Sequence, residues 1–147
     1  MNKKNNIDDQ VVSDFGREWQ AFNHQDLDPS MLDSAYDSYF HFFPFQDLKN
    51  LEGFDMGCGS GRWARFVAPQ VGFLNCIDPS HAALEEARLN MAGIQNCSLE
   101  CAGVDTNSLH DSSQDFGYSL GVLHHIPDTA LAPVSYTHLT LPTNREV

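Results

Sequence analysis

The chain has 147 residues, enough for one domain with a buried core, and its 41% hydrophobic and 11% aromatic residues argue against disorder. The formal net charge of −12 at pH 7 comes without a basic cluster, so we expect no nucleic-acid partner, because phosphates would be repelled. The lysines near the start precede no apolar run, and no stretch is long enough to span a bilayer, so we expect neither a signal peptide nor a membrane partner.

The cysteines at positions 58, 76, 97 and 101 form no C-x-x-C pair. A zinc site built from them is an alternative, but the spacing favours free thiols. Free thiols are typical of a reducing compartment, so the sequence predicts a cytoplasmic protein without a bound metal.

Residues 1–50 are predicted to form an N-terminal arm and a helical segment. Aromatic residues gather in the window 14–22, where they would pack on an apolar surface or lie over a cofactor pocket. Pro29 suits the first turn of a helix whose apolar face continues until Pro44 stops it. We interpret this face as a cover for a sheet. The alternative is that part of it borders a substrate pocket, through Tyr36, Tyr39 or His41.

A short apolar strand, from about Leu51 to Met56, leads into a loop with glycines at every second position. Because glycine has no Cβ, such a loop can turn sharply and a ligand can lie against its backbone. A helix predicted from Gly61 to about Ala68 would point its positive dipole end at the loop and favour an anion, whereas Asp55 would attract a cation. A site for both charges suits a zwitterionic amino acid better than a pyrophosphate.

The dinucleotide fingerprint G-x-G-x-x-G requires a glycine where this sequence has Arg62. The motif D-x-G-x-G-x-G that begins at Asp55 instead resembles the first motif of class I S-adenosylmethionine-dependent methyltransferases. The resemblance implies S-adenosyl-L-methionine as the cofactor, with its methionine part held by the loop. A tight turn that binds no ligand is the alternative. The candidate cofactor residues of this stretch are Asp55, Gly57, Cys58, Gly59, Ser60 and Gly61.

A second buried strand, from Phe73 to Asp78, also ends in an acid. Asp78 lies 21 positions after Gly57, near the spacing at which such an acid binds a ribose diol in nucleotide-binding folds. Pro79 and Ser80 complete this part of the candidate site, and Ser80 is predicted to cap a helix that runs to about Asn90. The apolar face of this helix is assigned to Ala83, Leu84, Ala87, Leu89 and Met91.

A third strand is expected at about 98–102, and Asp105 follows it in a loop. The resemblance implies that Asp105 accepts the adenine amino group, although a turn-forming role is an equal alternative. A fourth strand in the range 115–122 runs into a segment that, by the same resemblance, lies beside the reactive methyl, so Gly121 joins the candidate cofactor residues. The Asn-Pro-Pro-aromatic signature of methyltransferases acting on exocyclic nitrogens is absent, which disfavours nucleobases as acceptors.

His124 and His125 are weak catalytic candidates. Consecutive residues point in different directions, so they do not form the i, i+4 pair of a helical metal site. One of them could act as a general base for a substrate hydroxyl, since histidine titrates near neutrality. The alternative is that these histidines only pack and form hydrogen bonds beside the pocket.

From Val134 onward the sequence resembles a translated transposon-end adapter of the kind used in sequencing libraries. We therefore expect residues 51–133 to form the S-adenosylmethionine-binding domain and residues 134–147 to be a non-native tail. The resembling fold has more strands than residues 51–133 supply. The sequence thus predicts an α/β fold: a Rossmann-like three-layer α/β/α methyltransferase sheet that is truncated after about its fourth strand.

The predicted function is methyl transfer from S-adenosylmethionine to a small-molecule acceptor, with this chain an inactive fragment of the enzyme. Positioning of the methyl group against the acceptor would supply much of the rate enhancement. One alternative is a fragment of an NAD(P)-binding oxidoreductase, which Asp78 favours but Asp55 and Arg62 oppose. A non-catalytic module that binds nucleosides is the other alternative.

Overall fold

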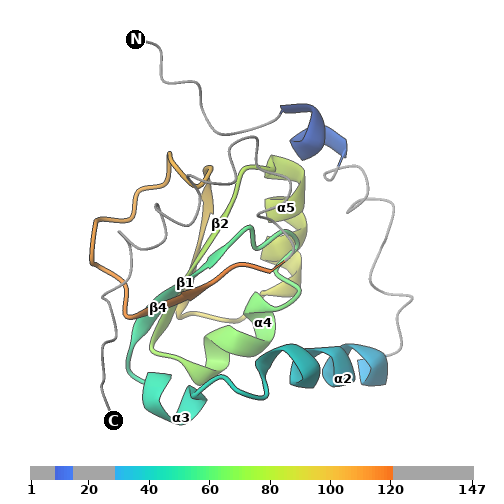
Figure 1. Ribbon diagram of the computed structural model, residues 1–147. Coiled ribbons are helices and arrows are strands. Elements are labelled where there is room, and N and C mark those ends of the chain that lie inside the picture. Colours follow the sequence, from blue (N-terminus) through green and yellow to red (C-terminus); the bar gives the residue numbers. More distant parts are fainter. Residues whose placement is uncertain (1–8, 15–28, 121–147) are drawn as a thin grey trace.

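The structure is a computed structural model that describes residues 9–14 and 29–120. At its centre lies a parallel sheet with the strand order β3-β2-β1-β4 (Figure 1). The strands are β1 (Glu52–Met56), β2 (Phe73–Asp78), β3 (Cys97–Cys101) and β4 (Phe116–Tyr118). Each lies within or next to the range predicted for it. The prediction of a Rossmann-like sheet with four strands is therefore confirmed.

Helices precede and connect these strands. They are α2 (Pro29–Phe40), α3 (Phe45–Leu48), α4 (Ala64–Val67), the short 3-10 helix η2 (Ala68–Gln70) and α5 (His81–Asn90), and residues 9–14 are also helical. In Figure 1, α2, α4 and α5 lie on the same side of the sheet. No helix among the described residues combines the length and the apolar character that crossing a membrane requires.

The two faces of the sheet are covered differently. On one face, apolar residues of α2, α4 and α5 pack with the strand residues Leu74, Cys76 and Phe116. On the other face, a smaller cluster is formed by Phe54, Met56 and Ile77 together with Val104, which belongs to the segment after β3. Within the described ranges, helices thus cover one face and the segment between β3 and β4 contributes to the cover of the other.

Two glycines fix how β1 pairs with β4. Gly53 lies opposite Phe116, and Gly117 lies opposite Phe54. A Cβ atom on Gly53 would come within 2.3 Å of the Phe116 ring, and one on Gly117 within 2.2 Å of the Phe54 ring. Each ring therefore occupies the space that a side chain on the opposite strand would need. A shift of the register would place the rings against larger residues.

The helix after the glycine loop is shorter than predicted. It was expected to begin near Gly61, but α4 begins at Ala64 and only turns precede it. The cause is the left-handed backbone of Gly61, whose φ of 73° is incompatible with a helix. The predicted helix start at Gly61 is therefore wrong, because the α-helix begins three residues later and has only four residues, whereas the attraction of an anion to this turn stays a prediction.

The helix α5 agrees with its prediction at both ends. The Ser80 hydroxyl accepts the Ala83 N–H at 3.3 Å, and Gly93 ends the segment with a φ of 90°. Leu89 is an exception, since 71% of it is exposed although it was assigned to the apolar face. It follows the buried Ala87 by two residues, which is about 200° around a helix, so it points away from the sheet.

Several predictions concern residues outside the described ranges. These are the aromatic window beyond residue 14, the end of the fourth strand with Gly121, the catalytic candidates His124 and His125, and the tail 134–147.

Candidate functional site

The glycine loop follows β1 and folds back onto the end of β2. All three of its glycines are left-handed, with φ values of 80° at Gly57, 54° at Gly59 and 73° at Gly61. The N–H groups of Gly57 and Cys58 both point to the carbonyl oxygen of Ile77, at 2.7 and 3.1 Å. Since side chains rarely adopt such φ values, this path requires glycine at every second position. The loop therefore forms at the carboxyl edge of the sheet, where ligands bind in open α/β folds.

Asp78 ties the loop to the next helix. Its Oδ2 accepts the N–H of Gly59 at 2.9 Å, and its Oδ1 accepts the N–H of Ser80 at 2.8 Å. Burial raises the pKa of this carboxyl above its ordinary value, while the two backbone hydrogen bonds lower it. Each oxygen can still accept one more hydrogen bond, as a ligand for a diol must. The sequence predicted the diol role of Asp78 but missed its bond to the loop.

The last turn of α5 supports the loop from the side. Asn90 donates from Nδ2 to the carbonyl oxygen of Ser60 at 2.9 Å. A Cβ atom on Gly61 would lie 2.9 Å from Sδ of Met91. Sequence reasoning missed both contacts, because they join residues far apart in the chain and neither residue belongs to a motif.

Asp55 is buried at the end of β1, with 3% of its surface exposed. Tyr118 of β4 is its direct neighbour across the strand pair. Burial raises the pKa of Asp55 to about 7; the Tyr118 hydroxyl lowers this value, and the nearby charge of Asp78 raises it. At neutral pH the carboxyl is thus poised between its two forms, and a cation that approaches it would favour the ionised form.

Three buried hydroxyl groups near the loop and β4 have no hydrogen bond of ordinary geometry within the described residues. They are Oγ of Ser60, Oη of Tyr118 and Oγ of Ser119. Leaving a buried hydroxyl unpaired costs about 1–3 kcal/mol, and most buried polar groups in proteins are paired. These hydroxyls belong to the loop after β1 and to the end of β4, and each can still form a hydrogen bond with a further group.

The cysteines contribute no reactive group to this site. Cys58, in the loop, is buried and lies close to Cys76 of β2. The contact with Cys76 and burial raise the pKa of the Cys58 thiol well above its ordinary value, so the thiol stays protonated. Both cysteines belong to the apolar cluster under the helices. Cys97 and Cys101, in β3, are also free thiols.

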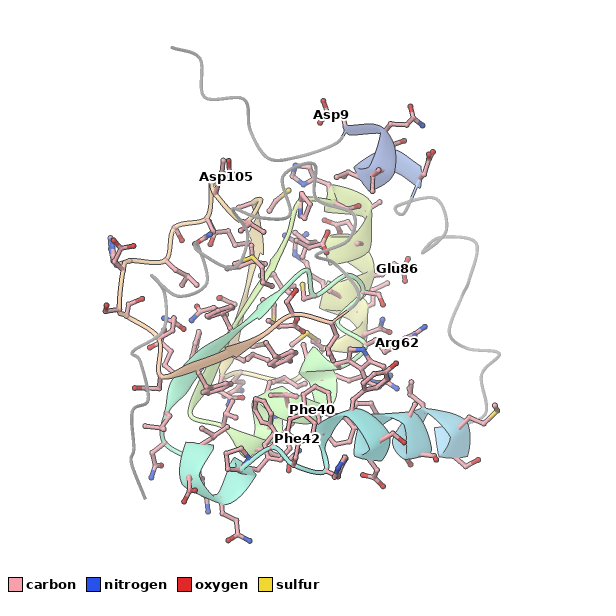
Figure 2. The ribbon with its side chains drawn as sticks, viewed as in Figure 1. Asp9, Phe40, Phe42, Arg62, Glu86 and Asp105 are labelled. Carbon is pink, nitrogen blue, oxygen red and sulfur yellow. The ribbon has the colours of Figure 1, made fainter. Side chains whose placement is uncertain are left out.

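Asp105 lies in the segment after β3, and Figure 2 shows it pointing away from the sheet. It is exposed. The role of Asp105 toward an adenine amino group stays a prediction, as does the alternative turn-forming role.

Pro79, another candidate residue, follows β2. Its carbonyl oxygen accepts a hydrogen bond from the Cys101 thiol at 3.5 Å.

The aromatic residues of α2 pack on α4 and on Trp63, which precedes α4. The Tyr36 ring stacks on Phe40 and Phe66, with centroids 4.8 and 4.9 Å apart. Tyr39 lies against Trp63 at 5.4 Å, although half of it is exposed. These contacts favour the interpretation of α2 as a cover. His41 is exposed, and the possibility that one of these residues borders a substrate pocket stays a prediction.

The sequence profile of a family described as "Methyltransferase domain" matches residues 54–137, which is more than half of the chain. The chain belongs to this methyltransferase family. The match contains the glycine loop, Asp78 and all strands except the first residues of β1. Membership of the family confirms the predicted resemblance and favours it over a nicotinamide-dependent oxidoreductase. No curated protein sequence matches the chain.

Solved structures of methyltransferases have the same fold. The N-methyltransferase NodS from Bradyrhizobium japonicum aligns with a TM-score of 0.74 at 16% identity, covering 91% of this chain and 69% of that one. Phosphoethanolamine N-methyltransferase 1 from Haemonchus contortus gives 0.71 at 16% identity, covering 88% and 30%. An S-adenosylmethionine-dependent methyltransferase from Mesorhizobium loti gives 0.65 at 25% identity, covering 76% and 51%. This chain thus spans about a third to two thirds of the length of these proteins.

Proposed function

We propose that this chain carries the cofactor-binding part of an S-adenosylmethionine-dependent methyltransferase that acts on a small molecule. The observation that carries the proposal is the Asp78 carboxylate, which the N–H groups of Gly59 and Ser80 hold beside a loop of left-handed glycines. Two similar structures support it, since NodS and the Haemonchus enzyme were each solved with S-adenosylhomocysteine. Because the chain spans only part of these proteins, methyl transfer is proposed for the whole enzyme.

The residues of the site match the polar groups of this cofactor. The Asp78 carboxylate would accept hydrogen bonds from the two ribose hydroxyls. The Asp55 carboxylate would accept hydrogen bonds from the ammonium group of the methionine part. The glycine loop would let that part lie against the backbone, and the unpaired hydroxyls of Ser60 and Ser119 are available to its polar atoms. When bound, S-adenosylmethionine supplies a methyl group on a positively charged sulfur.

A small-molecule acceptor is favoured by two observations. The charge of −12 disfavours nucleic acid, and the Haemonchus structure contains phosphoethanolamine, a small molecule. His124 and His125 stay candidates for a general base, outside the described ranges. If one of them acts as a base, its replacement by Gln should lower turnover of the whole enzyme about a hundredfold while cofactor affinity holds. Unchanged turnover in both variants would leave positioning as the source of catalysis.

Calorimetric titration of the 147-residue chain tests the cofactor. We expect it to bind S-adenosylmethionine and S-adenosylhomocysteine but not NAD, because Arg62 interrupts the dinucleotide frame and Asp55 would repel a pyrophosphate. Equal affinity for NAD would overturn the proposal. A turnover assay on the same chain tests the expectation that it is inactive by itself.

A further inference from the structure

Asp55 and Tyr118 form a pair in the sheet, but the proposed function assigns a role to Asp55 alone. They are direct neighbours on the parallel strands β1 and β4. Since residues at paired positions of a sheet project from the same face, both side chains lie on the helix-covered face. The carboxyl is buried, and the Tyr118 hydroxyl is buried without a hydrogen bond of ordinary geometry within the described residues. The hydroxyl is nevertheless close enough to act on the carboxyl.

The position of the Tyr118 ring is fixed by aromatic packing. It meets Phe40 edge to face, with centroids 5.3 Å apart, and Phe43 in the same way at 6.0 Å. A phenylalanine would make these contacts equally well and would bury no hydroxyl. The cost of a buried hydroxyl therefore calls for a function other than packing.

We propose that Tyr118 is a positioning residue: its hydroxyl donates to the Asp55 carboxylate and holds it toward the glycine loop, where the ammonium group of the cofactor binds. This inference rests on the proposed function. Tyr118 itself does not touch the reacting atoms. It acts through Asp55, on the recognition of the amino-acid part of the cofactor.

The groups that face Asp55 within the described residues determine the consequence for pH. They are Tyr118 from β4, Cys76 and Asp78 from β2, and Cys58 from the loop. Burial raises the pKa of Tyr118 well above its ordinary value, and the Cys58 pKa is raised as well, so both stay neutral. Burial is the main cause that opposes ionisation of Asp55, the Tyr118 hydroxyl favours it, and the charge of Asp78 adds a smaller opposition.

The affinity for a ligand with an ammonium group should therefore depend on pH in two ways. It rises with pH as Asp55 ionises, by up to about tenfold per unit on this acid limb. It falls again at alkaline pH as the ligand amine loses its proton. Without the Tyr118 hydroxyl, the acid limb moves to higher pH, whereas the alkaline limb, which belongs to the ligand, stays in place.

The experiment measures S-adenosylhomocysteine affinity by calorimetry from about pH 5.5 to about pH 9, a range that brackets both titrations. It compares the 147-residue chain with its Tyr118→Phe variant. We expect the acid limb of the variant to shift upward by about one pH unit, so that affinity falls about tenfold near pH 6 and less above pH 8. Adenosine, which lacks the ammonium group, should bind both proteins equally at every pH.

Phe43→Leu is the matched control. It loosens the packing around the Tyr118 ring but leaves the hydroxyl, so it should lower stability without moving the acid limb. An acid limb that stays in place in Tyr118→Phe would overturn the inference and leave the proposed function intact. If wild type binds neither ligand at any pH, the proposed function fails instead. Carbon-13 NMR titration of the Asp55 carboxyl then still tests the pair, since an unchanged pKa in Tyr118→Phe would overturn it.

Discussion

Asn75 in β2 and Asp55 in β1 are both polar residues inside a parallel sheet, but their surroundings differ. The Asn75 amide donates to Oε1 of Glu52 at 2.9 Å and to Oε1 of Gln114 at 3.0 Å, and its Oδ1 accepts the Ser98 hydroxyl at 3.0 Å. Gln114, with 2% of its surface exposed, also donates to Glu52. This network joins β1, β2 and β3 to Gln114, which lies just before β4. Its side chains satisfy one another's hydrogen-bonding groups.

The polar groups around Asp55 are not satisfied in this way. The hydroxyls of Ser60 and Tyr118 are buried without ordinary hydrogen bonds in the described part of the chain, and burial holds the pKa of Asp55 at about 7. The comparison shows that a buried polar group does not by itself indicate a binding site. A closed network contributes to stability, whereas an open one at a strand end leaves room for a ligand.

The largest expected effect comes from removing the Asp55 carboxyl, and it concerns the pH dependence of stability. Because the folded pKa of Asp55, about 7, is above its ordinary value, the folded state holds a proton that the unfolded state releases. The free energy of unfolding should therefore fall as pH rises from about 4 to about 7, by on the order of 4 kcal/mol. In Asp55→Asn this fall should shrink to the part that the raised pKa of Asp78 contributes.

Urea unfolding at a series of pH values measures this effect. Asp47→Asn, at an exposed site in α3, is the matched control and should keep the wild-type profile. Parallel profiles for wild type and Asp55→Asn would contradict the buried, proton-holding state of Asp55.

The next largest effect concerns the shape of the loop. Gly61→Ala should lower the free energy of unfolding by about 2–4 kcal/mol, because it adds left-handed strain to a clash with Met91. Gly93→Ala is the control, since Gly93 has a similar φ of 90° but nothing within 4 Å of an added Cβ. It should cost only about 1–2 kcal/mol of strain. Equal losses in thermal or urea unfolding would show that Met91 does not support the loop.

Asp78 belongs to both sides of the comparison, because it is bonded to the backbone and also open to a ligand. Asp78→Ala should weaken binding of S-adenosylhomocysteine by about 2 kcal/mol, or roughly thirtyfold, through the lost diol bonds. Asp55→Ala should have a comparable effect. Adenosine affinity separates the two, since it should fall in Asp78→Ala and hold in Asp55→Ala. A thirtyfold loss of adenosine affinity in both variants would contradict the separate roles.

Much of this architecture could be predicted from local sequence. Apolar runs that end in acids gave β1 and β2, and Ser80 with Gly93 gave the ends of α5. The start of α4 could not be predicted in this way, because a helical pattern does not reveal that Gly61 is left-handed.

Contacts between strands that are distant in the sequence could not be predicted. Tyr118 meets Asp55 only because β4 lies beside β1 in a particular register, and the glycines Gly53 and Gly117 that fix this register look like ordinary breaks in a strand. The network of Asn75 depends in the same way on strand order. Motifs thus located the ligand-binding edge, but the groups that tune it follow from contacts between segments distant in the chain.

The smallest expected effect tests the closed network directly. Asn75→Leu keeps the side-chain volume but removes the amide, which leaves Gln114 and Ser98 without their partner. This should cost about 1–2 kcal/mol of unfolding free energy. It should leave S-adenosylhomocysteine affinity unchanged, because the Asn75 side chain lies on the opposite face from Asp55. Tyr118→Phe should do the reverse, with stability held or raised and affinity lost on the acid limb. If calorimetry finds that Asn75→Leu weakens the ligand as much as Tyr118→Phe does, the division between a structural network and a binding site is wrong.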